Sequence, residues 1–573
     1  MTMDTHPTSA SRRRFLSLGA ASALACARLA AQTSQRIEAG PPAFVDRKRG
    51  IHPFRQLGTG TRPHIFLISA DMMSPDHWLP GRSVGQQMDL PAMRSLFADS
   101  TFFTNAFTTS PLCAPARAAL LTGRHTYLLA NNERAHDGFE ISLRAGDVIF
   151  PEYLKAAGYK TKHCGKGHLG AQKYFDAFDE NADGWDRWDP PILVDEGYVD
   201  HLRRLRVRPQ RYAREIFGLQ QDRASHGNSL GGWIEQDNGE PFPLEAQYSH
   251  YLAHRAISKL DSALQGASGS SPVYLQLDFF DPHQPFSIPE GFQKREAELR
   301  RALRLPGSYA AVRARDWAPS PDEPLVYDRY RRYWGLYQAK TVEDYRVAHA
   351  LQLEIVDRAL GRFLDALKQR GLYDDSLIVF TSDHGEMNGR RAMVDKGVYL
   401  HPEVLRVPLA VKMPKSAGIK PGVVDHAVSH LDIAPTVLSE VGVQPEERLD
   451  GQPLQPLLRD AADAGRKWLF ECGWHVGANF ACGMQGRMQN GDRYLYSYNI
   501  ASTVDELYDL RDEDPVNLAK SPDHQPIRKQ MVGQLGAFLE KDPRWLAWWS
   551  SYRIDHYHTM GRPQGDMQLK GAK

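Results

Sequence analysis

Three short apolar runs, far apart in the chain, each end at polar and ionisable residues. The runs are His64–Ala70, Pro272–Phe280 and Ser376–Thr381. Compact apolar runs of this kind are typical of strands buried on both faces, as in a parallel sheet covered by helices. Ligands of open α/β sheets bind beyond the carboxyl ends of such strands. The pattern therefore predicts an α/β fold whose site is formed by the residues that follow the runs, Asp71 and Asp383 among them.

Helices are predicted between these strands. From about residue 342 to 370, apolar side chains recur at helical spacing, and Gly371 closes the segment. A second helix is expected after Cys113, where Ala118–Leu121 precede Gly123. Both segments favour helices that cover a sheet, and they argue against a repeat architecture.

The length of 573 residues exceeds what one simple core accommodates, so two domains are expected. Residues 61–460 contain the apolar runs and form the larger α/β domain. Within it, residues 181–250 are rich in arginine and aromatic side chains, and we interpret them as insertions over the sheet edge. Residues 461–573 are predicted to form a smaller α+β subdomain, because short strand-like segments precede a helix at about 526–541. Residues 32–60 are polar and are interpreted as a linker.

The N-terminus carries Arg12-Arg13-Arg14-Phe15-Leu16 ahead of an alanine-rich run, Leu18–Ala31. Twin arginines before such a run are typical of the twin-arginine signal, which exports folded proteins through the Tat machinery. The run is too short and too rich in small residues for a membrane span, and no other stretch is long and apolar enough for one. Residues 1–31 therefore predict export to the periplasm or the extracellular space. A disordered basic tail is the alternative, and Leu24-Ala25-Cys26 offers a lipid anchor as a variant of export.

Charge and cysteine content narrow the class of protein. Lysine and arginine number 70 and aspartate and glutamate 69, which gives a net charge of +1. This balance lacks the basic excess that is typical of nucleic-acid-binding proteins. Five cysteines in a chain of this size do not make a disulfide scaffold, although Cys472 and Cys482 are candidates for a pair in an oxidising compartment. Cys164 is expected to be buried.

The segment Ser110–Arg117 has the pattern Cys-x-Pro-x-Arg around Cys113, and Leu121-Thr122-Gly123-Arg124 follows it. It resembles the signature of the sulfatase family, in which the cysteine is oxidised to formylglycine. The position usually taken by serine is Ala116 here, while the cysteine, proline and arginine that the formylglycine-generating enzyme reads are all present. For this segment alone, a buried cysteine at the start of a helix is the alternative interpretation.

Further blocks resemble the same family and follow in the family's order, from about residue 62 to 520. They are Gly165-Lys166-Gly167-His168-Leu169-Gly170, Pro282-His283-Gln284-Pro285-Phe286, Thr381-Ser382-Asp383-His384-Gly385-Glu386 with Lys396, Arg406-Val407-Pro408-Leu409, and Glu506-Leu507-Tyr508-Asp509-Leu510. The chain thus resembles the formylglycine-dependent type I sulfatases of the alkaline-phosphatase-like superfamily. The resemblance implies a sulfuric ester hydrolase with a mixed, mostly parallel sheet sandwiched by helices and a smaller C-terminal α+β subdomain.

The resemblance also implies a role for each matched residue. The ligands of one divalent cation, expected to be Ca²⁺, are Asp71, Cys113 as formylglycine, Asp383 and His384. The other catalytic residues are Arg117 and Lys166, which hold the formylglycine hydrate, His168, which takes a proton from it, and His283 and Lys396, which bind the ester and protonate its leaving group.

The chemistry of a sulfate monoester accounts for these residue types. The leaving oxygen gains charge as the S–O bond breaks, so catalysis needs fixed positive charge, a positioned nucleophile and a proton donor. A hard cation held by carboxylates supplies charge and orients a sulfate oxygen. A hydrated aldehyde suits the role of nucleophile, because its second hydroxyl lets the covalent sulfate be expelled without water attacking sulfur.

One position departs from the family's pattern. Many members have a second acidic ligand directly after the first, but here Asp71 is followed by Met72, and we see no reason to count Asp76 as a ligand. The cation is therefore expected to have one carboxylate fewer, which makes Mn²⁺ the alternative to Ca²⁺. Relatives that hydrolyse phosphonate or phosphate esters share the single aspartate, and this activity is the alternative function. Lys166 with His168 and the intact Cys-x-Pro-x-Arg favour sulfate.

Export and the habit of the family predict a sulfated small molecule or glycan as substrate. Three tryptophans are candidates for stacking on sugar rings, with local core packing as the alternative: Trp185, Trp188 and Trp233. Residues just after Lys396 are expected at the pocket mouth: Tyr399, His401 and Glu403. A non-catalytic carbohydrate-binding protein is the alternative of a different class, but every catalytic position holds a competent residue.

Overall fold

The computed structural model describes residues 54–56, 62–125, 143, 147–169, 172–179, 183–185, 195–265, 271–460, 468–475, 479–499 and 502–543. The predicted export signal and nearly all of the predicted linker lie outside these ranges, as do residues 544–573. Among the residues that are described, no helix combines the length and the apolar character that crossing a bilayer requires.

A nine-stranded sheet forms the centre of the larger domain, in the order β12-β3-β11-β10-β2-β8-β4-β5, with β13 paired to β3. Its strands are β2 (His64–Ala70), β3 (Thr101–Phe107), β4 (Lys160–Lys166), β5 (Asp183–Trp185), β8 (Val273–Phe279), β10 (Ser376–Ser382), β11 (Arg406–Lys412), β12 (Gly422–Val424) and β13 (Val428–Ser429). β11 is antiparallel to both of its neighbours, and the other pairings are parallel. The predicted mixed, mostly parallel sheet is confirmed.

The three apolar runs of the sequence are the adjacent strands β10, β2 and β8. Both faces of β2 are buried, because Phe66 and Ile68 belong to one hydrophobic core while Ile65 and Leu67 belong to another. The register pairs Ala70 at the end of β2 with Ser382 on one side and Phe279 on the other, so the three carboxyl ends are level. The residues that follow them therefore meet at one edge of the sheet.

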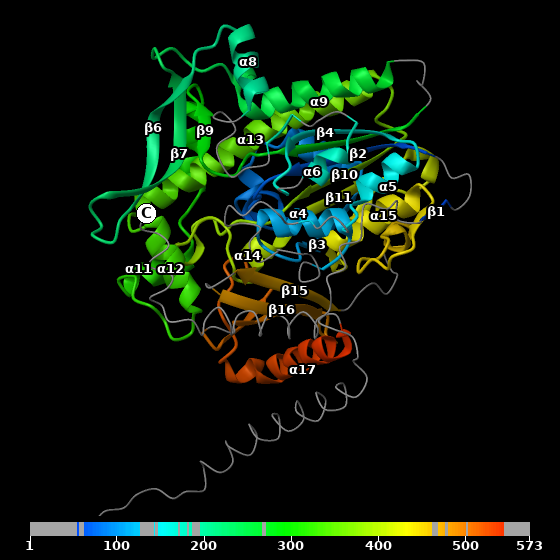
Figure 1. Cartoon of the computed structure of the whole chain (residues 1–573). Coiled ribbons are helices and arrows are strands. Elements are labelled where there is room, and N and C mark those ends of the chain that lie inside the picture. The colour runs from blue at the N-terminus through cyan, green and yellow to red at the C-terminus, as the bar shows by residue number, and fades with distance from the viewer. Residues whose placement is uncertain are drawn as a thin grey trace, which may run out of the picture. The chain divides into compact units, whose positions relative to one another are not determined.

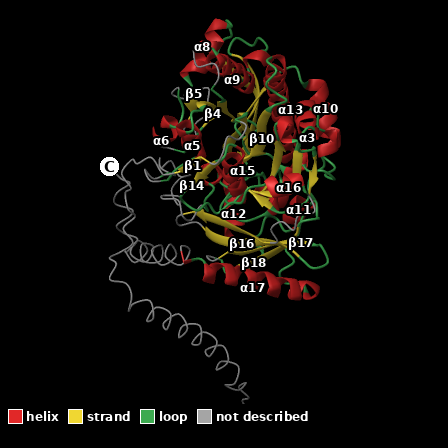
Figure 2. Ribbon diagram, turned by 90° about the vertical axis from the view of Figure 1, so that its right-hand side faces the viewer, coloured by secondary structure: helices red, strands yellow, loops and turns green. Residues whose placement is uncertain are grey.

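Helices cover both faces of the sheet (Figure 2). One face packs against α3 (Pro91–Ala98), α9 (Tyr248–Leu264) and α13 (Ala339–Gln369), and the other packs against α4 (Cys113–Thr122), α5 (Phe150–Ala156) and α15 (Ile433–Glu440). The predicted helices after Cys113 and near residues 342–370 are thus α4 and α13. Each ends before a glycine with positive φ, 64° at Gly123 and 67° at Gly371, as is common where a helix stops.

The segment rich in arginine and aromatic residues forms α8 (Glu196–Arg204) and a long hairpin of β6 (Gln210–Leu219) and β7 (His226–Gln236), which β9 (Phe286–Pro289) extends. Trp233 lies in β7, is only 2% exposed, and has the Arg214 guanidinium 3.9 Å from its ring centre. Of the two interpretations of Trp233, the structure supports local core packing, because the indole is buried in the hydrophobic core. Trp188 lies outside the described residues, and only the backbone of Trp185 is described.

A four-stranded antiparallel sheet follows, made of β15 (Trp468–His475), β16 (Asn479–Arg487), β17 (Arg493–Asn499) and β18 (Val504–Asp509). Helix α17 (Gln525–Lys541) packs against it through Met531 and Leu535 (Figure 1). The predicted C-terminal α+β arrangement is confirmed, and it belongs to the same compact unit as the larger sheet, residues 51–573. Cys472 and Cys482 are partners across β15 and β16, and Cys482 is a free, buried thiol.

Candidate active site

The predicted site residues gather where the parallel strands end. Asp71 and Asp383 directly follow the last residues of β2 and β10, and Lys166 is the last residue of β4. Cys113 is the first residue of α4, and Arg117 lies one turn further along that helix. These side chains are nearly or fully buried, so charges there act in a medium that screens them weakly.

Four of the site residues predicted from the sequence form a cluster that fits a divalent cation. Their ligand atoms lie within 4.8 Å of one another: Asp71, Cys113, Asp383 and His384. The His384 Nε2 lies 3.7 Å from Asp71 Oδ1 and 3.8 Å from Asp383 Oδ1. Oxygen ligands about 2.3–2.6 Å from a calcium ion give separations of this size between adjacent ligands. The Cys113 Sγ, 3.9 Å from Asp71 Oδ1, stands where an oxygen of formylglycine would be.

The imidazole of His384 is oriented for ligation. Its Nδ1 donates to the carbonyl of Gly385 at 3.0 Å, which directs Nε2 toward the cluster, 3.1 Å from Cys113 Sγ. Burial lowers the pKa of His384, but Asp383 and Cys113 outweigh burial and raise it to about 9. A negative cluster that attracts a proton so strongly also suits a bound cation.

The backbone of Met72 stands where many sulfatases have their second acidic ligand. Its N–H donates to Asp383 Oδ1 at 3.1 Å, and its carbonyl accepts a hydrogen bond from His349 Nε2 at 3.0 Å. Met72 has a left-handed φ of 64° and a fully buried side chain. The backbone of Met72 thus orients Asp383, a predicted ligand of the cation, and the side chain of Met72 supplies no ligand.

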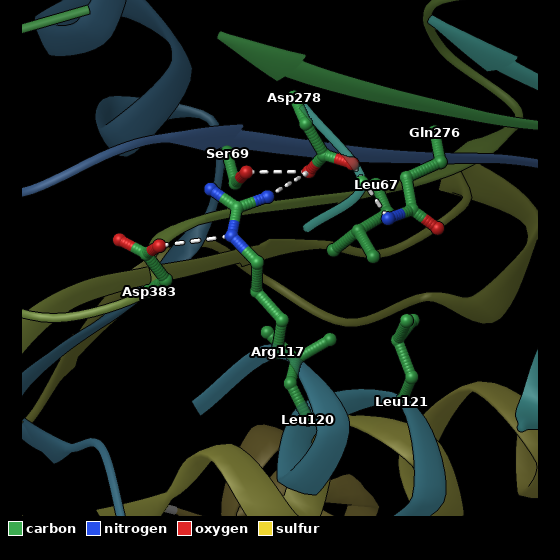
Figure 3. Close-up of a pocket in the computed structure, with 9 residues that line it drawn as sticks. Leu67, Ser69, Arg117, Leu120, Leu121, Gln276, Asp278 and Asp383 are labelled. Carbon is green, nitrogen blue, oxygen red and sulfur yellow. Dashed lines mark hydrogen bonds and ion pairs between the residues drawn. The ribbon is translucent and has the colours of Figure 1, made fainter. Parts of the chain in front are cut away.

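Two cations lie beside the cluster, Lys166 at the end of β4 and Arg117 in α4. Lys166 forms an ion pair with Asp71 Oδ2 and lies 3.6 Å from Cys113 Sγ. Arg117 donates from Nε to Asp383 Oδ2 at 2.9 Å (Figure 3). Its Nη1 donates to the carbonyl of Lys166 at 2.7 Å, and its Nη2 lies 3.4 Å from Asp71. Burial lowers the pKa of Arg117, but Asp383 and Asp71 raise it above its ordinary value. Arg117 is therefore a fixed positive charge at this site.

A lysine and a histidine form a second pair beside the cluster. Lys396 Nζ lies 2.5 Å from His283 Nε2 and 3.0 Å from Asp395 Oδ1. Burial lowers the pKa of Lys396, but Asp395, Cys113 and Asp71 together raise it above its ordinary value. Burial and Lys396 lower the pKa of His283, while Asp71 and Cys113 raise it in part. Lys396 therefore carries the proton of the pair, and its ammonium group donates a hydrogen bond to His283 Nε2.

His168 lies two residues beyond the end of β4, is 9% exposed and has a left-handed φ of 53°. The structure thus brings the predicted residues to one region of the sheet edge. Two acidic neighbours of these groups were not predicted from the sequence, Asp278 in β8 and Asp395. Two sequence features could have revealed them. Asp278 is an ionisable residue inside an apolar run, and Asp395 is an acidic residue directly before Lys396.

The predicted pocket-mouth residues are fully buried. His401 caps the short helix α14 (Pro402–Leu405) by accepting from the backbone N–H of Glu403, and Glu403 pairs with Arg82 at 2.7 Å. Tyr399 packs between the rings of Tyr327 and Tyr330. The prediction that these three side chains line an open mouth is wrong, because other side chains enclose all three.

Asp76 belongs to a separate ionic cluster. Arg390 binds both of its carboxylate oxygens, at 2.6 and 2.7 Å, and Arg346 lies 3.5 Å away. Burial raises the pKa of Asp76, but the arginines outweigh burial and hold it well below its ordinary value. Asp76 therefore balances arginines and is not among the clustered ligand atoms.

We expect Asp76→Asn to lower the free energy of unfolding at pH 7 by about 3–5 kcal/mol, because it leaves buried arginines without their partner. Chemical denaturation measures this loss. Since the folded-state pKa of Asp76 is depressed, its contribution is present above the pKa of an unfolded aspartate and is lost as the pH falls below it. The difference in the free energy of unfolding between the variant and the wild type should thus become smaller in acid. Asp237→Asn, which breaks an exposed pair with Arg208, should stay close to wild type, and equal losses in both variants would contradict this prediction.

Comparisons with known proteins agree with the geometry. The family model described as "Sulfatase" matches residues 63–443, and the model described as "N-sulphoglucosamine sulphohydrolase, C-terminal" matches residues 389–541. The uncharacterized sulfatase YidJ of Escherichia coli (strain K12) is 26% identical over 398 residues, which cover 68% of this chain and 70% of that protein. The choline-sulfatase of Rhizobium meliloti (strain 1021) is 25% identical over 473 residues, covering 81% and 84% respectively.

Solved structures share the fold. The phosphonate monoester hydrolase SpPMH from Silicibacter pomeroyi superposes with a TM-score of 0.64 at 20% identity, covering 84% of this chain and 96% of that one. BT4656 in complex with D-glucosamine-2-N,6-O-disulfate gives a TM-score of 0.58 at 18% identity, covering 84% and 99%. The chain therefore has the alkaline-phosphatase-like α/β fold of these structures.

Within that class, the chain belongs to the sulfatase family, whose model matches most of its length. It is a sulfuric ester hydrolase, and its reaction is the hydrolysis of sulfate esters. The likeness to phosphonate hydrolases is a likeness of fold alone, so that alternative is less well supported.

Proposed function

We propose that the chain hydrolyses a sulfate ester of a saccharide with a formylglycine formed from Cys113 and one divalent cation, Ca²⁺ with Mn²⁺ as the alternative. The observation that carries this proposal is the convergence of opposite charges on one side chain. The Cys113 Sγ has Lys166 Nζ at 3.6 Å, His384 Nε2 at 3.1 Å and Asp71 Oδ1 at 3.9 Å. A structural cysteine needs no such surroundings, whereas an activated nucleophile does.

The proposed cation ligands are two carboxylates, one imidazole and residue 113. When bound, the cation supplies positive charge for a sulfate oxygen, and formylglycine supplies the nucleophilic oxygen. This ligand set favours a hard cation through its carboxylates, and the imidazole makes manganese acceptable.

The remaining residues bind charge and move protons. Lys166 and Arg117, both buried beside Asp71, hold the oxygen of residue 113 in place. Lys396 keeps a proton directed at His283 Nε2, so that this pair can neutralise the leaving oxygen as the ester bond breaks. His168, two residues beyond the end of β4, is proposed as the base that accepts the proton when the sulfate is expelled.

Relatives and the N-terminal sequence support the substrate and the location. The N-acetylglucosamine-6-O-sulfatase of Bacteroides thetaiotaomicron is 24% identical over 449 residues. We propose an export signal at 1–31, a linker at 32–60, a catalytic domain at 61–460 and a subdomain at 461–573. The proposed location is periplasmic or extracellular, with the Tat machinery and a formylglycine-generating enzyme as partners.

Mass spectrometry of the peptide that contains Cys113, after co-expression with a formylglycine-generating enzyme, tests the nucleophile. We expect an aldehyde in place of the thiol. The converted protein should then release sulfate from defined sulfated saccharides faster than it cleaves aryl phosphonates or phosphate diesters. Activity confined to small aryl or alkyl sulfates would contradict the saccharide proposal, and a preference for phosphonates would favour the alternative function.

A further inference from the structure

Four polar side chains lie inside the apolar sheet beneath the active site. They are Ser69 in β2, His163 in β4, and Gln276 and Asp278 in β8, and each is at most 4% exposed. The register of the strands brings them together, because Ser69 is the partner of Asp278, and Gln276 is the partner of His163. No role in the reaction proposed above uses them. We refer to these four residues as the Asp278 cluster.

Both carboxylate oxygens of Asp278 are held by neutral donors. Oδ1 accepts from the Ser69 hydroxyl at 2.5 Å, and Oδ2 accepts from Gln276 Nε2 at 2.6 Å. His163 Nε2 lies 3.1 Å from Oδ2, and it must be the donor because a carboxylate only accepts. Burial lowers the pKa of His163, which keeps the ring neutral. Asp278 is thus a fixed negative charge in a prearranged position.

This charge faces Arg117. Figure 3 shows the guanidinium between Asp383 and Asp278, and Nη1 lies 3.8 Å from Asp278 Oδ1. A cavity of about 10 Å³ borders the same group, lined in part by Leu120 and Leu121, and it offers room for about one water molecule. Close packing therefore does not fix the guanidinium on this side. Its orientation depends on charge and hydrogen bonds.

The other two carboxylates around Arg117 are also expected to bind the cation. Asp383 and Asp71, at 2.9 and 3.4 Å from the guanidinium, are the proposed ligands of the cation. When they share their charge with a divalent cation, their attraction for Arg117 weakens, and the two positive groups repel each other. Asp278 is outside the group of clustered ligand atoms. It therefore remains available to balance the arginine.

We propose that Asp278 is a positioning residue that keeps the Arg117 guanidinium in place beside Asp71 and Asp383 while the cation occupies its site. The proposal rests on the proposed function, because it requires that Arg117 acts on formylglycine. Ser69, Gln276 and His163 contribute by holding the carboxylate of Asp278 in place.

The test is Asp278→Asn, which keeps the shape of the side chain and removes its charge. We expect kcat for a sulfate ester to fall about 10- to 100-fold, as is usual when a group that orients a catalytic residue is lost. KM should change less than about threefold, because the lost interaction matters mainly in the transition state. The cation Kd from calorimetry should rise, because Arg117 loses part of its charge balance, but by less than in Asp383→Asn, because Asp278 is not a ligand. Asp357→Asn, a buried carboxylate that caps α3 from α13, is the matched control and should keep kcat.

A double-mutant cycle with Arg117→Lys separates positioning from a general loss of structure. Lysine lacks the planar fork of arginine, so Asp278→Asn should cost less than about threefold in kcat in the Arg117→Lys background. An equal cost in both backgrounds, an unchanged kcat, or a cation Kd weakened as much as in Asp383→Asn would each overturn the proposal.

Ser69→Ala provides a second route if Asp278→Asn does not fold. It removes one donor to Asp278 and leaves the charge, so kcat should fall by about threefold. An unchanged kcat in this variant would overturn the proposal. A different result would refute the proposed function. If the wild-type protein retained a thiol at residue 113 or released no sulfate, the proposed function would be wrong before any variant is compared. The positioning role of Asp278 would then be wrong as well.

Discussion

The Cys113→Ala variant is expected to lose sulfate ester turnover by roughly 10⁴-fold or more, because removal of a nucleophile leaves only binding and electrostatic assistance. The methyl group of alanine cannot be converted to an aldehyde. Lys166, Arg117 and His283 stay in place around it, so the substrate should still bind. Release of sulfate from a sulfated saccharide, measured at saturating substrate, gives the effect.

Cys482→Ala is the matched control for this variant. Cys482 is likewise a buried cysteine, but it lies in the core between the C-terminal sheet and α17. Its loss should cost some stability and leave kcat close to wild type. Retention of full turnover by Cys113→Ala would refute the nucleophile that we propose, whatever the state of the control.

The centre of the sheet is predictable from the sequence because its strands are buried on both faces. Every position of β8 and β10 is buried, so both strands are mostly apolar and easily recognised, although β8 also contains Gln276 and Asp278. The direction of β11 is not predictable in the same way. Arg406–Lys412 is equally buried, and the path of the preceding loop, rather than any pattern of side chains, reverses the strand.

The candidate site is predictable where function depends on strand ends and on local motifs. Asp71, Asp383 and His384 follow apolar runs, and the resemblance supplied the others. Asp278 escaped notice because it lies within a strand, and its partners Ser69 and His163 become neighbours only through the register. Long-range pairing of this kind leaves no local signal in one sequence.

Exposure of single side chains was the weakest part of the prediction. A tryptophan in an insertion suits a sugar platform and a core equally well, and the packing of β7 decides for the core at Trp233. Residues 399–403 likewise have polar side chains whose partners come from distant segments, such as Arg82 for Glu403. Residue type alone does not reveal such partners.

The second large effect concerns the cation. Asp383→Asn is expected to raise the Kd of the divalent cation by about 100-fold or more, because it removes one of two charged ligands from a site whose affinity depends on ligand charge. The amide also no longer balances Arg117, whose Nε donates to Asp383 Oδ2 at 2.9 Å, so the uncompensated arginine would further repel the cation. Activity should fall with cation occupancy and recover in part at high cation concentration.

Calorimetric titration of chelator-treated protein with Ca²⁺ and with Mn²⁺ measures this effect and ranks the two ions. Asp357→Asn, with its buried carboxylate far along α13, should bind the cation as wild type does. If Asp383→Asn kept the wild-type Kd for both ions, the cation would have to lie outside the cluster of Asp71, Cys113, Asp383 and His384. The charge balance that places Arg117 beside this cluster would then need another explanation.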